Sequence, residues 1–230
     1  EDGSAGSGLM HSKYMVVDGH TVVTGSANFT PSCIHGDPDD RRTRGNVNHL
    51  LRFESAALAS LFQQDFAAMW GDGPGGRTDS RFGIAKASGP ARTVFVGKVP
   101  VQVLFAPHHK NDANHGLNLL ASTLSQAKRR VDMALFVFSA QQLTEVLAEL
   151  QRRRVKLRLL ADAGFASRPF SEVLDLLGVA MADQDCKLEA ANQPLPSPLE
   201  GVGIASLPGG DKLHHKVAVI DNRTVVTGSF

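Results

Sequence analysis

The clearest pattern along the second half of the chain is an alternation of short apolar runs with longer helical patterns. Apolar runs typical of buried strands occur at 101–106, 131–138 and 155–162, and helical patterns follow them at 118–129, 140–153 and 170–177. Strands that alternate with helices are typical of βαβ units and of a mostly parallel sheet. The pattern therefore predicts an α/β fold for this half.

The beginning of the chain shows a hairpin pattern instead. Apolar runs at 14–17 and 21–24 flank Asp18 and Gly19, a pair that favours a tight turn. The run YMVV at 14–17 and the similar run VAVI at 217–220 are apolar at both strand parities. Such strands are typically covered on both faces, as in a sheet packed between two layers.

A strand and a helix are expected after this hairpin. The strand is predicted at 49–55, and Ser55 is expected to cap a helix over 56–70, where apolar residues recur at helical spacing. The stretch 71–98 is rich in Gly, Pro and Ser, which indicates a linker.

The hairpin segment occurs twice in the chain. Aligned without gaps at an offset of 203, residues 11–27 and 214–230 share ten of seventeen positions. The shared residues of the first copy are His11, Lys13, Val16, Asp18 and 21–26, which recur as His214, Lys216, Val219, Asp221 and 224–229. Two copies this far apart predict two homologous lobes rather than a solenoid, whose repeats are shorter.

Both copies have the form H-x-K-x4-D-x6-G-S, and Asn28 extends the first copy to G-S-x-N. This resembles the signature of the phospholipase D superfamily. The resemblance implies two α/β lobes, each a mixed, mostly parallel sheet flanked by helices, with the active site between them. Residues 1–98 are then the C-terminal part of the first lobe plus the linker, and 99–230 are the second lobe. We expect a fragment truncated at both ends, since ten residues precede His11 and the second copy stops at Phe230.

The motif residues suit a phosphodiester. His11 and Lys13 share one face of a strand, and the hairpin doubles back to bring Ser26 and Asn28 toward them. The same reasoning places His214, Lys216 and Ser229 together in the second copy. A lysine ammonium with hydroxyl and amide donors stabilises phosphoryl oxygens.

The two aspartates of the motif, Asp18 and Asp221, lie at the opposite strand parity from their histidines. They are assigned to orienting the catalytic groups and stabilising the turns. The candidate catalytic residues are therefore His11, Lys13, Asp18, His214, Lys216 and Asp221, and the candidate phosphate-binding residues are Ser26, Asn28 and Ser229.

The resemblance also implies a mechanism through a phosphohistidine intermediate, without a metal or another cofactor. One motif histidine attacks phosphorus while the other protonates the leaving oxygen. His11 is favoured as the nucleophile because the N-terminal histidine usually takes this role in two-motif relatives. One departure is that family members often carry Glu-Asn after the first motif, whereas this chain has Asn46-Val47-Asn48. The acidic residue is therefore absent from this segment of the first lobe.

The amino-acid composition excludes fewer classes of function than the motifs do. The net charge of +1 and the pI near 8.1 argue neither for nor against a nucleic-acid substrate. The two cysteines, Cys33 and Cys186, show neither metal nor disulfide spacing and are expected to be free thiols. His108 and His109 of APHHK at 106–110, together with His115, could suggest a metal, but without a convincing acidic or Cys partner they indicate a polar loop.

Three functions remain open at this stage. Hydrolysis or headgroup transfer on phospholipids comes first, because two motifs in one chain is the usual arrangement of the lipases and lipid synthases. A metal-independent endonuclease of the same superfamily comes second, although only 6% aromatic residues weakly disfavours base stacking. A catalytically silent phosphate-binding module comes third. No obligate protein partner is expected, and the cellular location stays undetermined.

Overall fold

The computed structural model describes residues 9–37, 39–73, 79–86, 89–188 and 192–229. The chain forms two compact units, which are described separately below. Unit 1 comprises Glu1–Gly25 and Leu50–Leu119, and unit 2 comprises Ser26–His49 and Leu120–Phe230. Units of packing need not coincide with units of homology, so the lobe boundary between residues 98 and 99 stays a prediction.

Unit 1 is built on an antiparallel sheet of three strands in the order β1-β2-β3. The strands are β1 (Tyr14–Val17), β2 (Thr21–Gly25) and β3 (Leu50–Glu54). Helix α2 (Ala56–Trp70) follows β3 directly, and the Ser55 hydroxyl caps it by accepting a hydrogen bond from the main-chain N–H of Leu58. The predicted hairpin, third strand and capped helix are therefore confirmed.

The core of unit 1 lies between helix α2 and one face of this sheet. Val22, Leu58, Ala59 and Phe62 are its buried residues. Side chains on the other face of the edge strand β1 are exposed, with Met15 at 44% and Val17 at 45%. The prediction that the first YMVV strand is covered on both faces is therefore wrong for the described residues, because α2 packs on only one face.

The segment 71–98, interpreted as a linker, contains regular structure in its described part. A 3₁₀ turn, η1 (Gly83–Ala85), is followed by a two-stranded hairpin of β4 (Arg92–Val96) and β5 (Val99–Val103). Gly97 has a φ of +59°, the left-handed conformation that a tight hairpin turn favours. The strand predicted at 101–106 thus pairs within this hairpin and packs in the core of unit 1 rather than starting the large sheet.

A buried ion pair joins the region after α2 to the core of unit 1. The ammonium of Lys86 lies 2.5 Å from Oδ1 of Asp65, and the two side chains are 5% and 3% exposed. The Tyr14 hydroxyl donates to Oδ2 of the same carboxylate at 2.9 Å. Burial, and then the charge of Asp65, raises the pKa of Tyr14 far above its usual value, so the phenol stays a donor.

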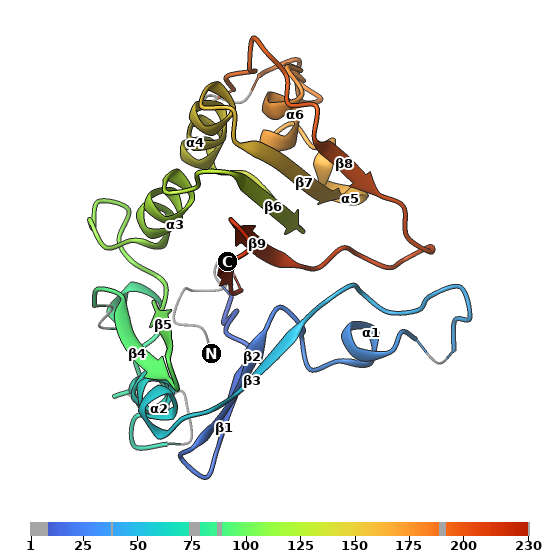
Figure 1. Ribbon diagram of the computed structural model, residues 1–230. Helices are drawn as coiled ribbons and strands as arrows, with labels where there is room; N and C mark the ends of the chain where they lie inside the picture. Colours follow the sequence, from blue (N-terminus) through green and yellow to red (C-terminus); the bar gives the residue numbers. More distant parts are fainter. Residues whose placement is uncertain (1–8, 38, 74–78, 87–88, 189–191, 230) are drawn as a thin grey trace. The chain divides into compact units, whose positions relative to one another are not determined.

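Unit 2 contains the large sheet, of five strands in the order β10-β9-β6-β7-β8 (Figure 1). The strands are β6 (Arg130–Leu135), β7 (Lys156–Asp162), β8 (Val202–Ala205), β9 (Lys216–Ile220) and β10 (Thr224–Thr227). The pairs β6–β7 and β7–β8 are parallel, whereas β6–β9 and β9–β10 are antiparallel. The fold is α/β as predicted, but the sheet is evenly mixed rather than mostly parallel, because the second motif joins it as a hairpin.

The helices predicted near 118–129, 140–153 and 170–177 are present, and two short helices occur that the sequence pattern did not predict. In chain order, the helices are α1 (Pro31–Ile34), α3 (Gly116–Ser125), α4 (Gln141–Arg152), α5 (Ala163–Ala166) and α6 (Glu172–Leu176). The part of α3 from Leu120 onward belongs to unit 2. Leu147 and Leu150 of α4, Leu176 of α6 and Val131 of β6 are fully buried in one core. Among the described helices, none has the length and apolar character needed to cross a membrane.

Candidate functional site

The first motif copy begins at the open end of the β1–β2 hairpin in unit 1. The ammonium of Lys13 donates to the main-chain oxygen of His11 at 2.6 Å, and the Lys13 side chain is almost fully buried. The Thr24 hydroxyl donates to the main-chain oxygen of Lys13 at 3.0 Å. Asp18 occupies the hairpin turn with a φ of +51°, as expected for its turn role.

The second motif copy repeats this local geometry in unit 2. The ammonium of Lys216 donates to the main-chain oxygen of His214 at 3.1 Å, and the Thr227 hydroxyl donates to the main-chain oxygen of Lys216 at 3.1 Å. Asp221 occupies the β9–β10 turn with a φ of +52°. Identical residues at identical spacing thus adopt the same hydrogen-bonded hairpin in both copies.

Asp221 does more than form a turn. Its carboxylate accepts hydrogen bonds from the main-chain N–H groups of Lys128, Arg129 and Arg130 at 2.8–2.9 Å. The hydrogen bond from Arg130 and then that from Lys128 hold the pKa of Asp221 below its ordinary value. The carboxylate therefore links the motif hairpin to the start of β6 by hydrogen bonds. Asp221 lies at the end of β9 that is opposite to His214 and Lys216.

The ring of His214 is fixed by oxygen acceptors. Its Nδ1 lies 3.0 Å from the main-chain oxygen of Ser26 and 3.0 Å from Oδ1 of Asn48. The amide nitrogen of Asn48 donates to the main-chain oxygens of Cys33 and Asn46, which leaves Oδ1 as the acceptor. Nδ1 of His214 must therefore carry a proton, which leaves Nε2 as the ring nitrogen that can give or take a proton.

The cation of the site lies directly beside this ring. The ammonium of Lys216 is 3.3 Å from both Nδ1 and Nε2 of His214. An ammonium next to this ring is placed to compensate the charge of a bound phosphoryl group.

The predicted phosphate-binding residues lie in unit 2, and one of them contacts this group. Ser26 is fully buried, and its hydroxyl donates to Oδ1 of Asn48 at 3.1 Å. Asn28 is half-buried and precedes α1, and Ser229 follows β10. The structure thus brings Ser26 to His214, whereas the predicted convergence of His11 and Lys13 with Ser26 and Asn28 stays a prediction.

Sequence reasoning missed two neighbours of His214. Asn48 belongs to the segment whose missing acidic residue was noted as a departure, and its neutral amide lies beside the histidine. Phe136 follows β6, with its ring centroid 4.7 Å from that of His214 and 5.1 Å from the ammonium of Lys216. Its place at the carboxyl end of a strand next to β9 is the signal that could have identified it.

The APHHK histidines participate in loop hydrogen bonds, as the polar-loop interpretation predicts. Nε2 of His108 pairs with the main-chain oxygen of Gly89, and Nδ1 of His109 accepts from the N–H of Asn111. Within the described ranges, no group of three or more His, Cys, Asp or Glu side chains is arranged to hold a metal ion.

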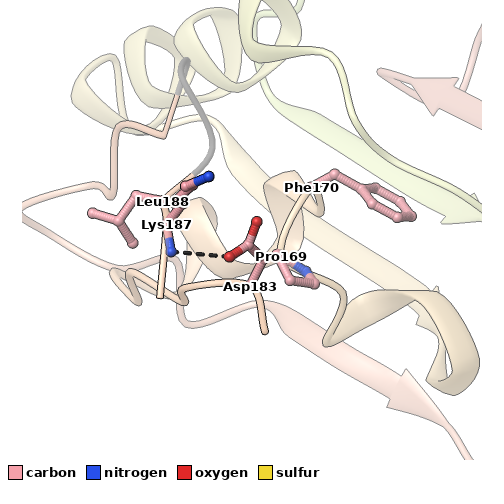
Figure 2. Close-up of a pocket in the computed structure, with 5 residues that line it drawn as sticks. All are labelled: Pro169, Phe170, Asp183, Lys187 and Leu188. Carbon is pink, nitrogen blue, oxygen red and sulfur yellow. Dashed lines mark hydrogen bonds between the residues drawn. The ribbon is translucent and has the colours of Figure 1, made fainter. Parts of the chain in front are cut away.

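An open pocket of about 320 Å³ also lies in unit 2, but it contains no motif residue. Figure 2 shows its lining of Pro169, Phe170, Asp183, Lys187 and Leu188, with the main-chain N–H of Lys187 donating to the carboxylate of Asp183. The histidine and lysine groups described above remain the candidate active site.

Residues 2–70 and 120–230 match the family described as "Cardiolipin synthase, PLD-like domain". The matched segments include both motif copies and most of the chain, so the protein belongs to this family of the phospholipase D superfamily. The predicted superfamily is therefore confirmed.

Particular relatives are similar over shorter stretches. The mitochondrial cardiolipin hydrolase of Xenopus laevis is 29% identical over 104 residues, which are 45% of this chain and 40% of that protein. The phospholipase D of Rickettsia prowazekii (strain Madrid E) is 29% identical over 111 residues, which are 48% of this chain and 44% of that protein. The aligned part thus spans less than half the length of either relative.

A solved structure supports the fold over nearly the whole chain. The phosphatidylserine synthase of Haemophilus influenzae Rd KW20 superimposes with a TM-score of 0.52 and 12% identity. The match covers 94% of this chain and 52% of that one. At this identity, the comparison shows a shared α/β fold alone.

Proposed function

We propose that the protein is a phospholipase D-like phosphodiesterase that hydrolyses or transfers phosphodiesters, in the first place phospholipids. The observation that carries this proposal is the state of His214. Oxygen acceptors hold its Nδ1 proton, Nε2 is left to exchange a proton with the substrate, and the ammonium of Lys216 lies 3.3 Å away. Membership of the family described as "Cardiolipin synthase, PLD-like domain" supports phosphodiester chemistry for this group.

The proposed reaction has two displacement steps. In the first, Nε2 of one motif histidine forms a bond to phosphorus, and the bond from phosphorus to the leaving oxygen breaks. The other motif histidine gives its proton to that oxygen. In the second step, this histidine takes a proton from water or an alcohol, whose oxygen attacks phosphorus and displaces the first histidine. Lys13 and Lys216 stabilise the negative charge on the phosphoryl oxygens throughout.

The choice of phospholipids rests on the named relatives, a cardiolipin hydrolase and a phospholipase D. Substrate class is tested by incubating the full-length protein in parallel with phosphatidylcholine vesicles and with plasmid DNA. We expect release of the lipid headgroup and intact plasmid. Nicked plasmid with unchanged lipid would show a nuclease of the same superfamily, and no reaction with either would favour a silent phosphate-binding module.

Chelation should leave the activity intact. The lysines supply the positive charge that a metal ion supplies in many phosphodiesterases, so saturating EDTA is expected to change the rate of headgroup release little. A zinc-dependent phosphodiesterase assayed in the same buffer serves as the control for effective chelation. Complete loss of activity that is restored by zinc or magnesium would contradict the metal-free mechanism.

The covalent intermediate can be trapped in a variant whose second step is blocked. In full-length His214→Asn protein, a substrate with an activated leaving group needs no acid catalyst, so the first step should proceed while the second stalls. Mass spectrometry is expected to find the phosphoryl group on His11. A phosphoramidate is acid-labile and base-stable, which distinguishes it from phosphoserine at Ser26. An adduct on His214 in the reciprocal His11→Asn variant would reverse the roles, and failure of both variants to label would contradict the covalent mechanism.

A further inference from the structure

A second pair of histidines lies next to the His214–Lys216 group in unit 2. The rings of His49 and His215 lie edge to edge and nearly coplanar, with their centroids 5.0 Å apart and an angle of 12° between their planes. Their Nδ1 atoms are 2.8 Å apart, which is a hydrogen-bond distance. An N–H···N hydrogen bond requires that one ring donates and the other accepts.

The contacts that Thr227 makes with His49 and with Lys216 determine which histidine ring donates in this hydrogen bond. The Thr227 hydroxyl donates its hydrogen to the main-chain oxygen of Lys216, so toward His49 it can only accept. Nε2 of His49 therefore carries a proton and donates to Thr227. In the neutral ring, Nδ1 of His49 is then the acceptor, and Nδ1 of His215 is the donor.

Both rings are in an environment that keeps them neutral. Burial lowers the pKa of His49 and of His215 below the ordinary histidine value, and the charge of Lys216 acts on both in the same direction. The neutral forms are those in which His215 can donate to His49 while His49 donates to Thr227.

His49 also contacts the first motif copy. Its main-chain N–H donates to the Ser26 hydroxyl oxygen at 3.3 Å, and its Nδ1 is 3.3 Å from the same oxygen. One residue thus contacts Ser26 of the first copy and His215 and Thr227 of the second. The first copy has Ser12 at the position equivalent to His215. A histidine pair like that of His49 and His215 can therefore form only at the second copy.

We propose that His49 is a positioning residue for the second motif: together with His215 and Thr227, it fixes the main chain of Lys216 and thereby the place of the Lys216 ammonium beside His214. The chain of contacts runs from His215 through His49 to the Thr227 hydroxyl and ends on the main-chain oxygen of Lys216. The catalytic consequence rests on the proposed phosphodiesterase function.

The kinetic test uses full-length His49→Phe and His215→Phe variants, which keep an aromatic ring at the position but lose the ring nitrogens. A displacement of a catalytic group by about 1 Å can lower the catalytic rate on the order of 100-fold. We expect kcat to fall by about 10- to 100-fold with KM nearly unchanged. The double variant should be hardly slower than either single variant, because the two rings act as one unit. His49→Gln, which keeps a donor and an acceptor, should recover part of the loss.

His20 provides a matched control. It is an exposed histidine that pairs with Glu54 in unit 1, so His20→Phe should leave kcat unchanged. Wild-type kcat in folded His49→Phe protein would overturn the proposal. Additive losses in the double variant would also overturn it, because they would show that the rings act separately.

Two spectroscopic readouts do not depend on activity. In protein labelled with ¹⁵N-histidine, NMR should show Nδ1 protonated in His215 and unprotonated in His49, and the opposite tautomers would contradict the proposed contacts. The side-chain ¹⁵N signal of Lys216, followed during titration with inorganic phosphate, should differ between wild type and His49→Phe. An unchanged signal and titration would overturn the positioning role, even if the wild-type protein proved to have no phosphodiesterase activity.

Discussion

Replacing His214 by asparagine in the full-length protein is expected to lower turnover by several orders of magnitude, on the order of 10⁴-fold or more. The asparagine amide is still able to donate toward the oxygens of Ser26 and Asn48 that now face Nδ1. It has neither the nucleophilic lone pair nor the titratable proton that the proposed reaction uses. The loss should therefore be in the chemical step rather than in folding, and it is measured as kcat for headgroup release.

His11→Asn should have a similar effect, because each histidine supplies one half of the proton and phosphoryl relay. The double variant is expected to be hardly worse than either single variant, since groups that act as a unit give non-additive losses. His20→Asn, at an exposed position in unit 1, is the control for a general effect of losing a histidine. Activity close to wild type in either motif variant would remove that histidine from the mechanism.

The second large effect is expected on stability, at the buried ion pair of unit 1. Lys86→Met removes the cation that lies 2.5 Å from the carboxylate of Asp65, whose side chain is 3% exposed. Leaving one buried charge without its partner typically costs about 3–5 kcal/mol. Urea denaturation should show this decrease in the free energy of unfolding.

A compensating variant separates the loss of charge pairing from the loss of packing. Lys86→Met combined with Asp65→Leu removes both charges, and replacing a whole buried pair by apolar side chains is often neutral. The double variant should therefore regain most of the stability. Arg42→Ala, which breaks an exposed ion pair with Asp40, should leave the unfolding free energy essentially unchanged. Equal stability of Lys86→Met and wild type would show that this ion pair does not stabilise unit 1.

The sequence by itself determined the features that depend on local patterns. The duplicated motif predicted two hairpins of the same form, and the structure shows the same Lys-to-His and Thr-to-Lys hydrogen bonds in both. Ser55 and the helical spacing after it predicted α2 with its observed bounds. Capping, turn formation and side-chain periodicity act between residues close in sequence, so one segment contains the information that sets them.

Only the tertiary structure decided which distant segments meet at the second motif. The segment Ser26–His49 packs with the second half of the chain in unit 2, where Asn48 contacts His214 and His49 contacts His215, each pair 166 residues apart. It also decided that the second motif joins the sheet antiparallel to β6, which made the sheet evenly mixed. Such pairings depend on the shape and burial of whole surfaces, and no pattern within one segment specifies the partner that it will meet.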